Sequence, residues 1–266
     1  MEILAESTIY QTVDGKDKFF RKSYFVRQDG ITYYSSWKDQ SSKPTDISQF
    51  EKLTIIKTHD RGPKIQETWA VVSQEEYYLK APVINEFINP DLEHTIQCEL
   101  EIWEILRRNP HPNIATYYGC REENGRATGL CFKRYKETLF NKANPRFLEK
   151  KEFQASGRES VDDSLKGNIH GVLEGIKHLH SLGIVHNNIK PASIMLDEHG
   201  VPVIINFGSC LKIGDKLWPS GGGRTVGWYD PGNEIALEKN DLDAFEELKT
   251  WLFGSDAYLF EEKFRE

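Results

Sequence analysis

The chain has 266 residues, of which 38% are apolar and 28% charged, and its formal net charge at pH 7 is −7. A chain of this length can bury a core without a disulfide or a metal staple. Its acidic balance argues against a general nucleic-acid or membrane-surface role, and no apolar run approaches the roughly 18 residues that cross a bilayer. We therefore expect one globular protein that binds neither nucleic acid nor membrane.

Two features indicate the compartment. The four cysteines, Cys98, Cys120, Cys131 and Cys210, form no C-x-x-C pair, and residues 1–6 lack the basic and apolar stretches of a signal peptide. Both favour a reducing setting, cytoplasmic or nuclear. The basic pair Lys150-Lys151 lies between two glutamates, so we interpret it as part of a solvated surface.

Residues 1–50 form an N-terminal extension to which the sequence assigns no role. Within it, the turn dipeptide Asp29-Gly30 and the sheet-forming residues around it predict a β-hairpin over 22–35. The segment 37–48 is rich in Ser, Lys, Asp and Pro and is typical of a linker.

The pattern after the linker predicts a sheet and one helix. Apolar residues recur at helical spacing over 91–108, and Asn124-Gly125 marks a turn between two strands. The predicted strands are 53–58, 68–73, 77–80, 115–120 and 128–135. These elements make a five-stranded sheet with one helix.

The second half of the chain is mainly helical. Apolar residues over 165–182 lie on one face of a predicted helix that ends at Gly183, and a last helix is expected over 242–253. Two short strands, 193–197 and 201–206, lie between them. The fold class is therefore α+β.

Two loops in this half resemble a known family. The runs GIVHNNIKPASIML (183–196) and VIINFGSC (203–210) resemble the catalytic and metal-binding loops of eukaryotic-type protein kinases. Upstream, the stretch 111–114 is similar to the kinase segment after helix C, and Lys80 occupies the place of the strand-3 lysine. The sequences of segments 181–187 and Gly227-Trp228-Tyr229-Asp230 resemble those of kinase-like proteins that are numerous in filamentous fungi.

The resemblance implies a two-lobed kinase-like domain over residues 51–266. The N-lobe would span about 51–135, with the five-stranded sheet and helix C, and the C-lobe about 136–266. The kinase helices that should follow the region of Asp241 are largely missing, so the C-lobe is expected to be minimal.

The resemblance also places a nucleotide site. Lys80 would contact phosphates, and Glu99 on the predicted helix would be its ion-pair partner, with Glu101 as the alternative. The alternative is that both are surface charges, but the downstream motifs favour the functional placement. The cofactor-binding set implied by the family is completed by Phe132, Lys133 and Tyr135.

The catalytic positions carry unusual residues. Asn188 stands where kinases have the catalytic-loop aspartate, while Lys190 keeps the family's lysine. A neutral amide can orient a hydroxyl but cannot accept its proton at pH 7. The loss of general-base help typically costs about 10²- to 10⁴-fold in rate.

The metal positions are changed as well. Asn206 replaces the D-F-G aspartate and Ser193 replaces the catalytic-loop asparagine, whereas Mg²⁺ prefers carboxylate and phosphate oxygens. We therefore expect no metal ligands, weak or absent Mg²⁺ binding and no required cofactor, with ATP as an optional ligand.

Two residues bear on the nucleotide cleft. The loop 59–64 contains one glycine, Gly62, where kinases have G-x-G-x-x-G, so its cover for phosphates is expected to be weak. Tyr78 stands in the place of a small alanine on the face of Lys80. Either the tyrosine partly fills the cleft, or a strand shift buries it elsewhere.

Other residues are assigned to the scaffold. His186 and Phe207 resemble the apolar spine that joins the two kinase loops. Asp241 either caps the last helix or tethers the His186 loop, as its kinase counterpart does. Segment 220–228 replaces the activation segment and lacks A-P-E.

The combined changes favour a pseudokinase, a kinase fold that serves as a binding or regulatory module for protein partners. The alternative is a weak ATP-dependent Ser/Thr phosphotransferase with little metal dependence. The paired Asp-to-Asn changes could be natural or engineered, and the sequence does not specify the oligomeric state.

Overall fold

A computed structural model describes residues 1–13, 16–72, 76–217 and 223–254. Its strands are β1 (Glu2–Val13), β2 (Lys16–Gln28), β3 (Ile31–Trp37), β4 (Thr54–Ile55), β5 (Tyr78–Lys80), β6 (Tyr117–Glu123), β7 (Arg126–Phe132), β8 (Glu137–Thr138), β9 (Ile184–Val185), β10 (Ile194–Leu196), β11 (Pro202–Ile204) and β12 (Leu211–Lys212). Its α-helices are α1 (Leu92–Arg108), α2 (Leu139–Ala143), α3 (Lys150–Ala155), α4 (Asp163–Asn168), α5 (His170–Ser181) and α6 (Glu238–Phe253). Four short 3₁₀ helices are η1 (Ile47–Gln49), η2 (Ile84–Ile88), η3 (Pro191–Ser193) and η4 (Phe207–Ser209).

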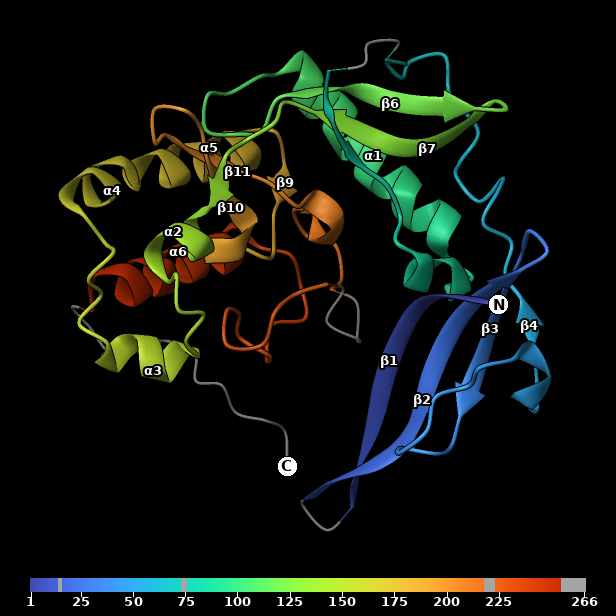
Figure 1. Ribbon diagram of the computed structural model, residues 1–266. Helices are drawn as coiled ribbons and strands as arrows, with labels where there is room; N and C mark the ends of the chain where they lie inside the picture. Colours follow the sequence, from blue (N-terminus) through green and yellow to red (C-terminus); the bar gives the residue numbers. More distant parts are fainter. Residues whose placement is uncertain (14–15, 73–75, 218–222, 255–266) are drawn as a thin grey trace.

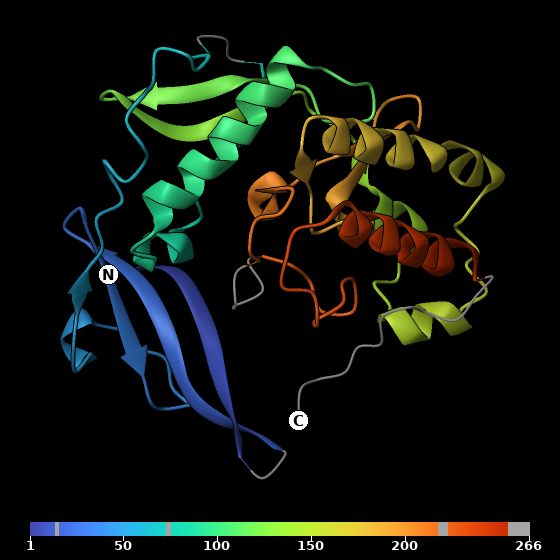
Figure 2. The same ribbon diagram turned by 180° about the vertical axis from the view of Figure 1, so that it is seen from behind.

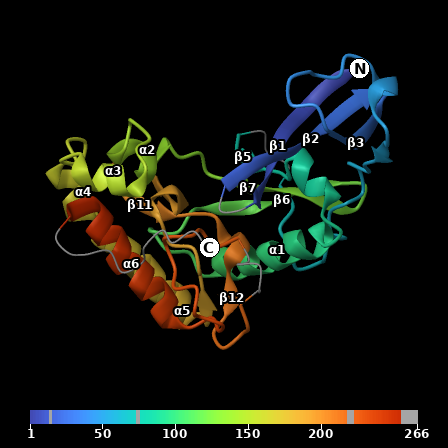
Figure 3. The same cartoon turned by 90° about the horizontal axis from the view of Figure 1, so that it is seen from below.

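Three groups of elements make up the chain (Figure 1). An N-terminal sheet has the order β1-β2-β3-β4, and a second sheet has the order β5-β7-β6 with α1 beside it. The remaining helices and the small sheets β11-β10-β8 and β12-β9 form the C-terminal half. Viewed from below, α5 and α6 lie next to each other in that half (Figure 3), and they are in contact.

The N-terminal sheet contains the predicted hairpin. β2 and β3 pair antiparallel from Lys22 with Trp37 to Gln28 with Ile31. Asp29 and Gly30 both have positive φ, 52° and 77°, as a two-residue hairpin turn requires. β1, which the sequence pattern did not predict, pairs antiparallel with β2 and extends the sheet.

The first two strands predicted for the kinase-like sheet are wrong. Of residues 53–58, only β4 is a strand, and it pairs with β3 of the N-terminal sheet. The described part of 68–73 holds an isolated bridge between Val71 and Cys120. Instead of a ladder, the buried Trp69 ring joins the core and the Glu104 carboxylate accepts the N–H of Ala70.

The second sheet therefore has three strands rather than five in the described parts of the chain. In addition to these strands, an isolated antiparallel bridge pairs Lys64 with Arg126 of β7. The short strands of the C-terminal half belong to separate sheets.

Helix α1 matches the predicted helix and connects the two halves of the core. Its predicted apolar face is buried, namely Leu92, Ile96, Leu100, Trp103 and Leu106. The Trp103 ring lies 4.7 Å from that of Phe132 and 4.3 Å from that of Phe207, measured between centroids. One indole thus packs against both the second sheet and the loop after β11.

The predicted helix over 165–182 is two helices. α4 begins at an N-cap, Asp162, whose side chain accepts the N–H of Leu165, and α5 follows after Ile169. The predicted apolar face is retained, since Ile169, Val172, Ile176 and Leu179 are buried.

The interpretation of Lys150 as a solvated lysine is wrong. Its side chain is buried, forms an ion pair with buried Glu247 of α6, and donates to the Gly227 carbonyl at 2.6 Å. Its ammonium lies 4.8 Å from the Trp228 ring centroid. Lys151, the next residue, is exposed. A buried carboxylate on a helix nearly one hundred positions away decides which lysine turns inward.

Within the described ranges, no helix has the length and apolarity needed to span a membrane.

Candidate functional site

A cavity of about 470 Å³ lies between the second sheet, α1 and the β10–β11 segment. This volume falls within the range typical of small-molecule sites. It is lined by Tyr78, Lys80, Glu99, Trp103, Ala115, Phe132, Lys133, Arg134, Tyr135, Thr138, Ala192, Met195, Ile205 and Asn206. The five residues predicted to bind a cofactor and the replaced metal ligand Asn206 are all in this set. Asn188, Lys190 and Ser193 are not.

Lys80 and Glu99 form an ion pair in the wall of the cavity. The Lys80 Nζ lies 2.6 Å and 2.9 Å from the two oxygens of Glu99. The Trp103 indole N–H donates to the same carboxylate at 3.3 Å. Glu101 is exposed on α1 and accepts from Gln97, so the structure places Glu99, and not Glu101, against the lysine.

The segment after β7 forms another wall. The Thr116 N–H donates to the hydroxyl of Tyr135 at 2.9 Å, and the backbone N–H of Lys133 donates to the Thr116 carbonyl. The Lys133 ammonium pairs with Glu198 at 3.1 Å, and this hydrogen bond raises the pKa of Lys133. The Phe132 ring packs on Trp103.

Tyr78 is a wall residue of the cavity. Tyr78 pairs directly with Phe132 in the sheet, so β5 has the strand position that brings Lys80 to Glu99. The tyrosine is 52% exposed. The alternative of a strand shift that buries this tyrosine elsewhere is therefore wrong. The 470 Å³ cavity remains open beside the ring.

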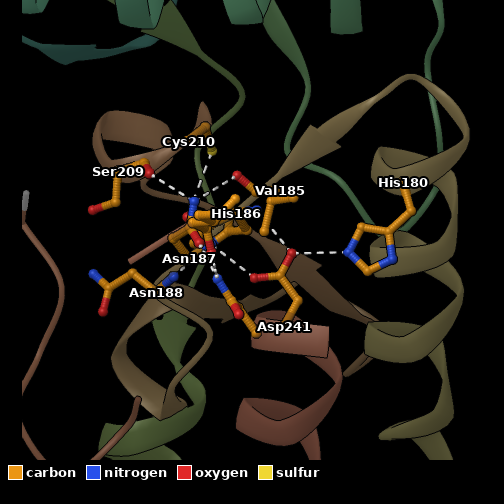
Figure 4. Close-up of polar contacts among 10 residues, drawn as sticks. His180, Val185, His186, Asn187, Asn188, Ser209, Cys210 and Asp241 are labelled. Carbon is orange, nitrogen blue, oxygen red and sulfur yellow. Dashed lines mark hydrogen bonds and ion pairs between the residues drawn. The ribbon is translucent and has the colours of Figure 1, made fainter. Parts of the chain in front are cut away.

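Asp241 holds the catalytic-type loop (Figure 4). Its buried carboxylate accepts the backbone N–H groups of His186 at 2.8 Å and Asn187 at 2.7 Å, and it lies 3.0 Å from the Nε2 of His180. Because α6 is capped at Leu237, Asp241 lies inside the helix. It tethers the loop and does not cap the helix.

Asn187 completes the tether. Its φ is 61°, a left-handed conformation that asparagine tolerates better than most residues. The side-chain amide donates to the carbonyl oxygens of Val185 and Ser209, both at 3.3 Å (Figure 4). Its own oxygen accepts from Asn240 of α6.

His186 is fully buried and neutral. Its Nδ1 accepts the backbone N–H of Asn188 at 3.2 Å, so the ring proton is on Nε2, which donates to the Ile205 carbonyl at 2.9 Å. Burial lowers the pKa of His186. The Phe207 ring stands edge-on to the imidazole at 5.0 Å, which joins the two loops as the family resemblance implies.

Asn188 and Lys190 are bonded to the chain itself. The Asn188 amide donates to the Gly223 carbonyl at 3.0 Å, while its buried Oδ1 has no hydrogen-bond partner among the residues that the structure describes. The Lys190 ammonium donates to the Thr225 hydroxyl at 2.5 Å, and burial lowers its pKa. The described segment 223–225 therefore accepts hydrogen bonds from the Asn188 amide and the Lys190 ammonium. Residues 220–222 of the predicted activation segment lie outside the described residues.

The residues at the metal positions do not fit a Mg²⁺ site. Asn206 lines the cavity but offers a neutral amide, and Ser193 is fully buried with a hydroxyl that finds no partner within the described ranges. The cavity carboxylate, Glu99, is taken by Lys80 and Trp103. Across the parts of the chain that the structure describes, no cluster of three His, Cys, Asp or Glu side chains could hold a metal.

The loop 59–64 lies away from this cavity. It borders a separate cavity of about 230 Å³, which shares no lining residue with the first. A Cβ on Gly62 would come within 1.7 Å of the Ala127 carbonyl oxygen, so this glycine permits close packing on β7. Its carbonyl accepts from Arg126 at 2.6 Å. The loop thus contributes no wall to the Lys80 cavity.

Sequence reasoning missed several cavity residues. The sequence places Trp103 among the apolar residues of the predicted helix, and the predicted site contains none of Arg134, Met195 and Ile205. Arg134 lies between two residues that were predicted to bind a cofactor. Met195 lies between buried Ile194 and Leu196 on β10, and because all three residues are apolar, the sequence pattern does not set it apart.

The chain is similar in sequence to several known protein kinases. MAP kinase kinase kinase wis4 of Schizosaccharomyces pombe is 33% identical over 118 residues, which are 43% of this chain and 7% of that protein. The serine/threonine-protein kinase/endoribonuclease IRE1 of Hypocrea jecorina is 32% identical over 145 residues, 51% of this chain and 11% of that protein. Serine/threonine-protein kinase Tao of Drosophila melanogaster is 24% identical over 227 residues, covering 80% of this chain and 20% of that protein.

The chain thus corresponds to a small part of each of these relatives. The family model described as the protein kinase domain matches residues 65–229, more than half of the chain. This span contains Lys80, Glu99, the His186 loop and Asn206. The chain belongs to the protein kinase domain family.

Proposed function

We propose that this protein is a pseudokinase, a kinase fold that acts as a binding or regulatory module for protein partners. The observation that carries the proposal is the state of Asn188. Its amide is bonded to the Gly223 carbonyl and it has no carboxylate with which to accept a proton from an acceptor hydroxyl. The loop that positions an acceptor in a kinase is here bonded to its own chain.

The metal positions support the same conclusion. Catalysis of phosphoryl transfer depends on positioning and on neutralising the charge that develops on the phosphates. Asn206 and Ser193 supply no negative ligand for Mg²⁺, and the loop with Gly62 does not reach the cavity. Base, metal ligands and phosphate cover are therefore changed together.

A second candidate is a weak ATP-dependent Ser/Thr phosphotransferase that needs little metal. It is favoured by the Lys80–Glu99 ion pair beside an open cavity of nucleotide size. In that case Lys80 would contact the phosphates of ATP. The apolar wall of Phe132, Ala115 and Met195 would hold the adenine ring. Loss of the catalytic base alone slows turnover without abolishing it.

A thermal-shift titration tests whether nucleotide binds, and a phosphorylation assay then separates the two functions. ATP is added with Mg²⁺ or with a chelator, and Lys80→Ala is the control variant. No shift supports a scaffold without nucleotide, whereas a chelator-insensitive shift that is lost in Lys80→Ala supports metal-free binding. Phosphorylation of the protein itself or of a generic substrate, lost in Lys80→Ala, would overturn the pseudokinase.

The triple variant Asn188→Asp, Ser193→Asn, Asn206→Asp tests where the loss lies. Robust activity in this variant would place the loss in these three positions alone. We expect it to stay inactive, because the cavity has no phosphate cover from the loop with Gly62.

We further propose that the chain belongs with the kinase-like proteins of filamentous fungi and works in the cytoplasm or nucleus. The wording of 227–230 supports the first point. The four free cysteines, three of them buried, support a reducing compartment. A pull-down from the native cell would identify the partner.

A further inference from the structure

β1 forms an open edge of the N-terminal sheet. Among the described residues it is the first strand in the order β1-β2-β3-β4 and its strand partner is β2, while η2 also contacts it. Both views show this long strand on the side of the N-terminal sheet that faces the C-terminal half (Figures 1 and 2). Its 12 residues make it longer than most strands in globular proteins. An edge of this length presents a row of N–H and C=O groups to any strand that can approach.

The sequence of β1 does not protect this edge. Residues 2–13 contain no proline, lysine or arginine, which natural sheets use to block pairing at an edge. One irregularity lies in β1 at Leu4, between the pairs of Ile3 and Ala5. The second irregularity has its extra residue, Phe20, on β2. From Ala5 onward, the free side of β1 is therefore a regular strand.

Charge does not keep a second copy of β1 away. The acidic residues of the strand are Glu2 and Glu6. Glu6 is paired with Lys43 at 2.8 Å and with Lys22 at 3.6 Å within its own sheet. The strand thus presents a neutralised carboxylate at its centre, flanked by Ser7, Thr8 and Ile9.

A two-fold register joins two such strands without conflict. When antiparallel β1 strands meet with Ile9 opposite its own copy, Thr8 faces Tyr10 and Ser7 faces Gln11. Glu6 then faces Thr12, and no like charges are opposed. By contrast, a register centred on Glu6 would oppose two carboxylates. The Ile9 register also uses the whole regular stretch of the strand, and Tyr10 is 55% exposed for this contact.

We propose that a second copy of this chain pairs with β1 edge to edge, antiparallel and centred on Ile9. The two N-terminal sheets then form one continuous sheet across a dimer. This inference is independent of the proposed function, because it rests on residues outside the matched kinase span 65–229.

Sedimentation equilibrium of the full chain across a range of concentrations tests the dimer, with two matched variants. Ser7→Lys with Gln11→Lys opposes lysines on both sides of the two-fold axis, and we expect a monomer. Ser7→Lys with Gln11→Glu opposes lysine and glutamate, and we expect the dimer to return. Circular dichroism checks that both variants are folded.

Cysteine cross-linking tests the register. In a Cys98→Ser background, which removes the exposed cysteine, Ile9→Cys is expected to form a disulfide-linked dimer on mild oxidation. Phe20→Cys, exposed on the neighbouring strand, is the control and should stay monomeric. A wild-type chain that is monomeric throughout, a dimer that survives Ser7→Lys with Gln11→Lys, or cross-linking no faster at Ile9 than at Phe20 would overturn the proposal.

Discussion

The Asp241 carboxylate accepts the backbone N–H of His186 at 2.8 Å, although 55 positions separate the two residues. The same carboxylate accepts the N–H of Asn187 and contacts His180 (Figure 4). This anchor acts on the backbone of the loop and does not depend on the side chain at 188. The loop can therefore keep its shape after its catalytic aspartate has been exchanged.

Asp241→Asn is expected to lower the free energy of unfolding by about 2–4 kcal/mol. Hydrogen bonds to a buried charged group contribute about 1.5–3 kcal/mol each, and an asparagine would turn an NH₂ group toward one of the backbone donors. Urea unfolding measures the loss. Asp243→Asn, on the same helix but more accessible, is the control and should stay within about 0.5 kcal/mol. Similar losses in both variants would contradict the anchor.

Stability is expected to fall on acidification because of His186. Burial lowers its pKa in the folded state, so below the ordinary value of about 6.5 the unfolded chain binds the proton first. The contribution is fully present above that pH and is lost as pH falls from about 6.5 toward the folded pKa, at up to about 1.4 kcal/mol per pH unit.

Urea unfolding at several pH values between neutral and mildly acidic conditions measures this slope. His186→Gln, which does not titrate, should show a shallower slope than the wild type. The lowered pKa of His111 adds a slope of the same sign in both proteins, so the difference between them reports His186. Equal slopes would show that His186 does not carry the effect.

The two neighbouring lysines should respond very differently to substitution. Lys150→Met leaves the buried Glu247 carboxylate without its ammonium, and breaking a buried pair in this way costs about 3–5 kcal/mol. Lys151→Met, at the exposed neighbour, should cost less than about 0.5 kcal/mol. Thermal or urea unfolding compares them.

The double variant Lys150→Met with Glu247→Leu tests the cause. Because an apolar pair can replace a buried ion pair at little net cost, it should be more stable than Lys150→Met alone. If the double variant lost the sum of both single effects, the ion pair would not be the reason.

Glu99→Gln should weaken the junction between α1 and β5. The ammonium of Lys80 is partly exposed, so solvent screens the pair and the expected loss is about 1 kcal/mol. Glu101→Gln, two residues further along the same helix, should change stability by less than about 0.5 kcal/mol. Any ATP-induced thermal shift should shrink in the first variant and persist in the second. An equal response would contradict the assignment of Glu99.

Local patterns explain the successful predictions. The buried face of α1 follows from apolar residues three and four positions apart, and the β2–β3 hairpin follows from positive φ at Asp29 and Gly30. The identity and order of the loops around His186 and Asn206 follow from their sequence motifs. Each of these signals lies within a few residues of chain.

The failures involve competition between distant segments. Residues 53–58 have strand composition, but composition does not say which sheet they join, and β4 pairs with β3. The sequence predicts weak phosphate cover by the loop with Gly62, but it does not predict that this glycine packs on the Ala127 backbone. The sequence does not decide whether Asp241 caps the last helix or tethers the His186 loop, because that choice depends on the residue at which α6 begins.

The amides at 188 and 206, where the kinase resemblance would place carboxylates, are written in the chain, and an amide carries no charge and accepts no proton at pH 7. Only the tertiary structure decided that the Asn188 amide bonds to the Gly223 carbonyl. It also decided that Lys150 is buried against Glu247. Covalent identity sets which protons and charges a residue can carry. Contacts between positions 35 or 97 apart depend on how the whole chain packs, and no local pattern encodes that packing.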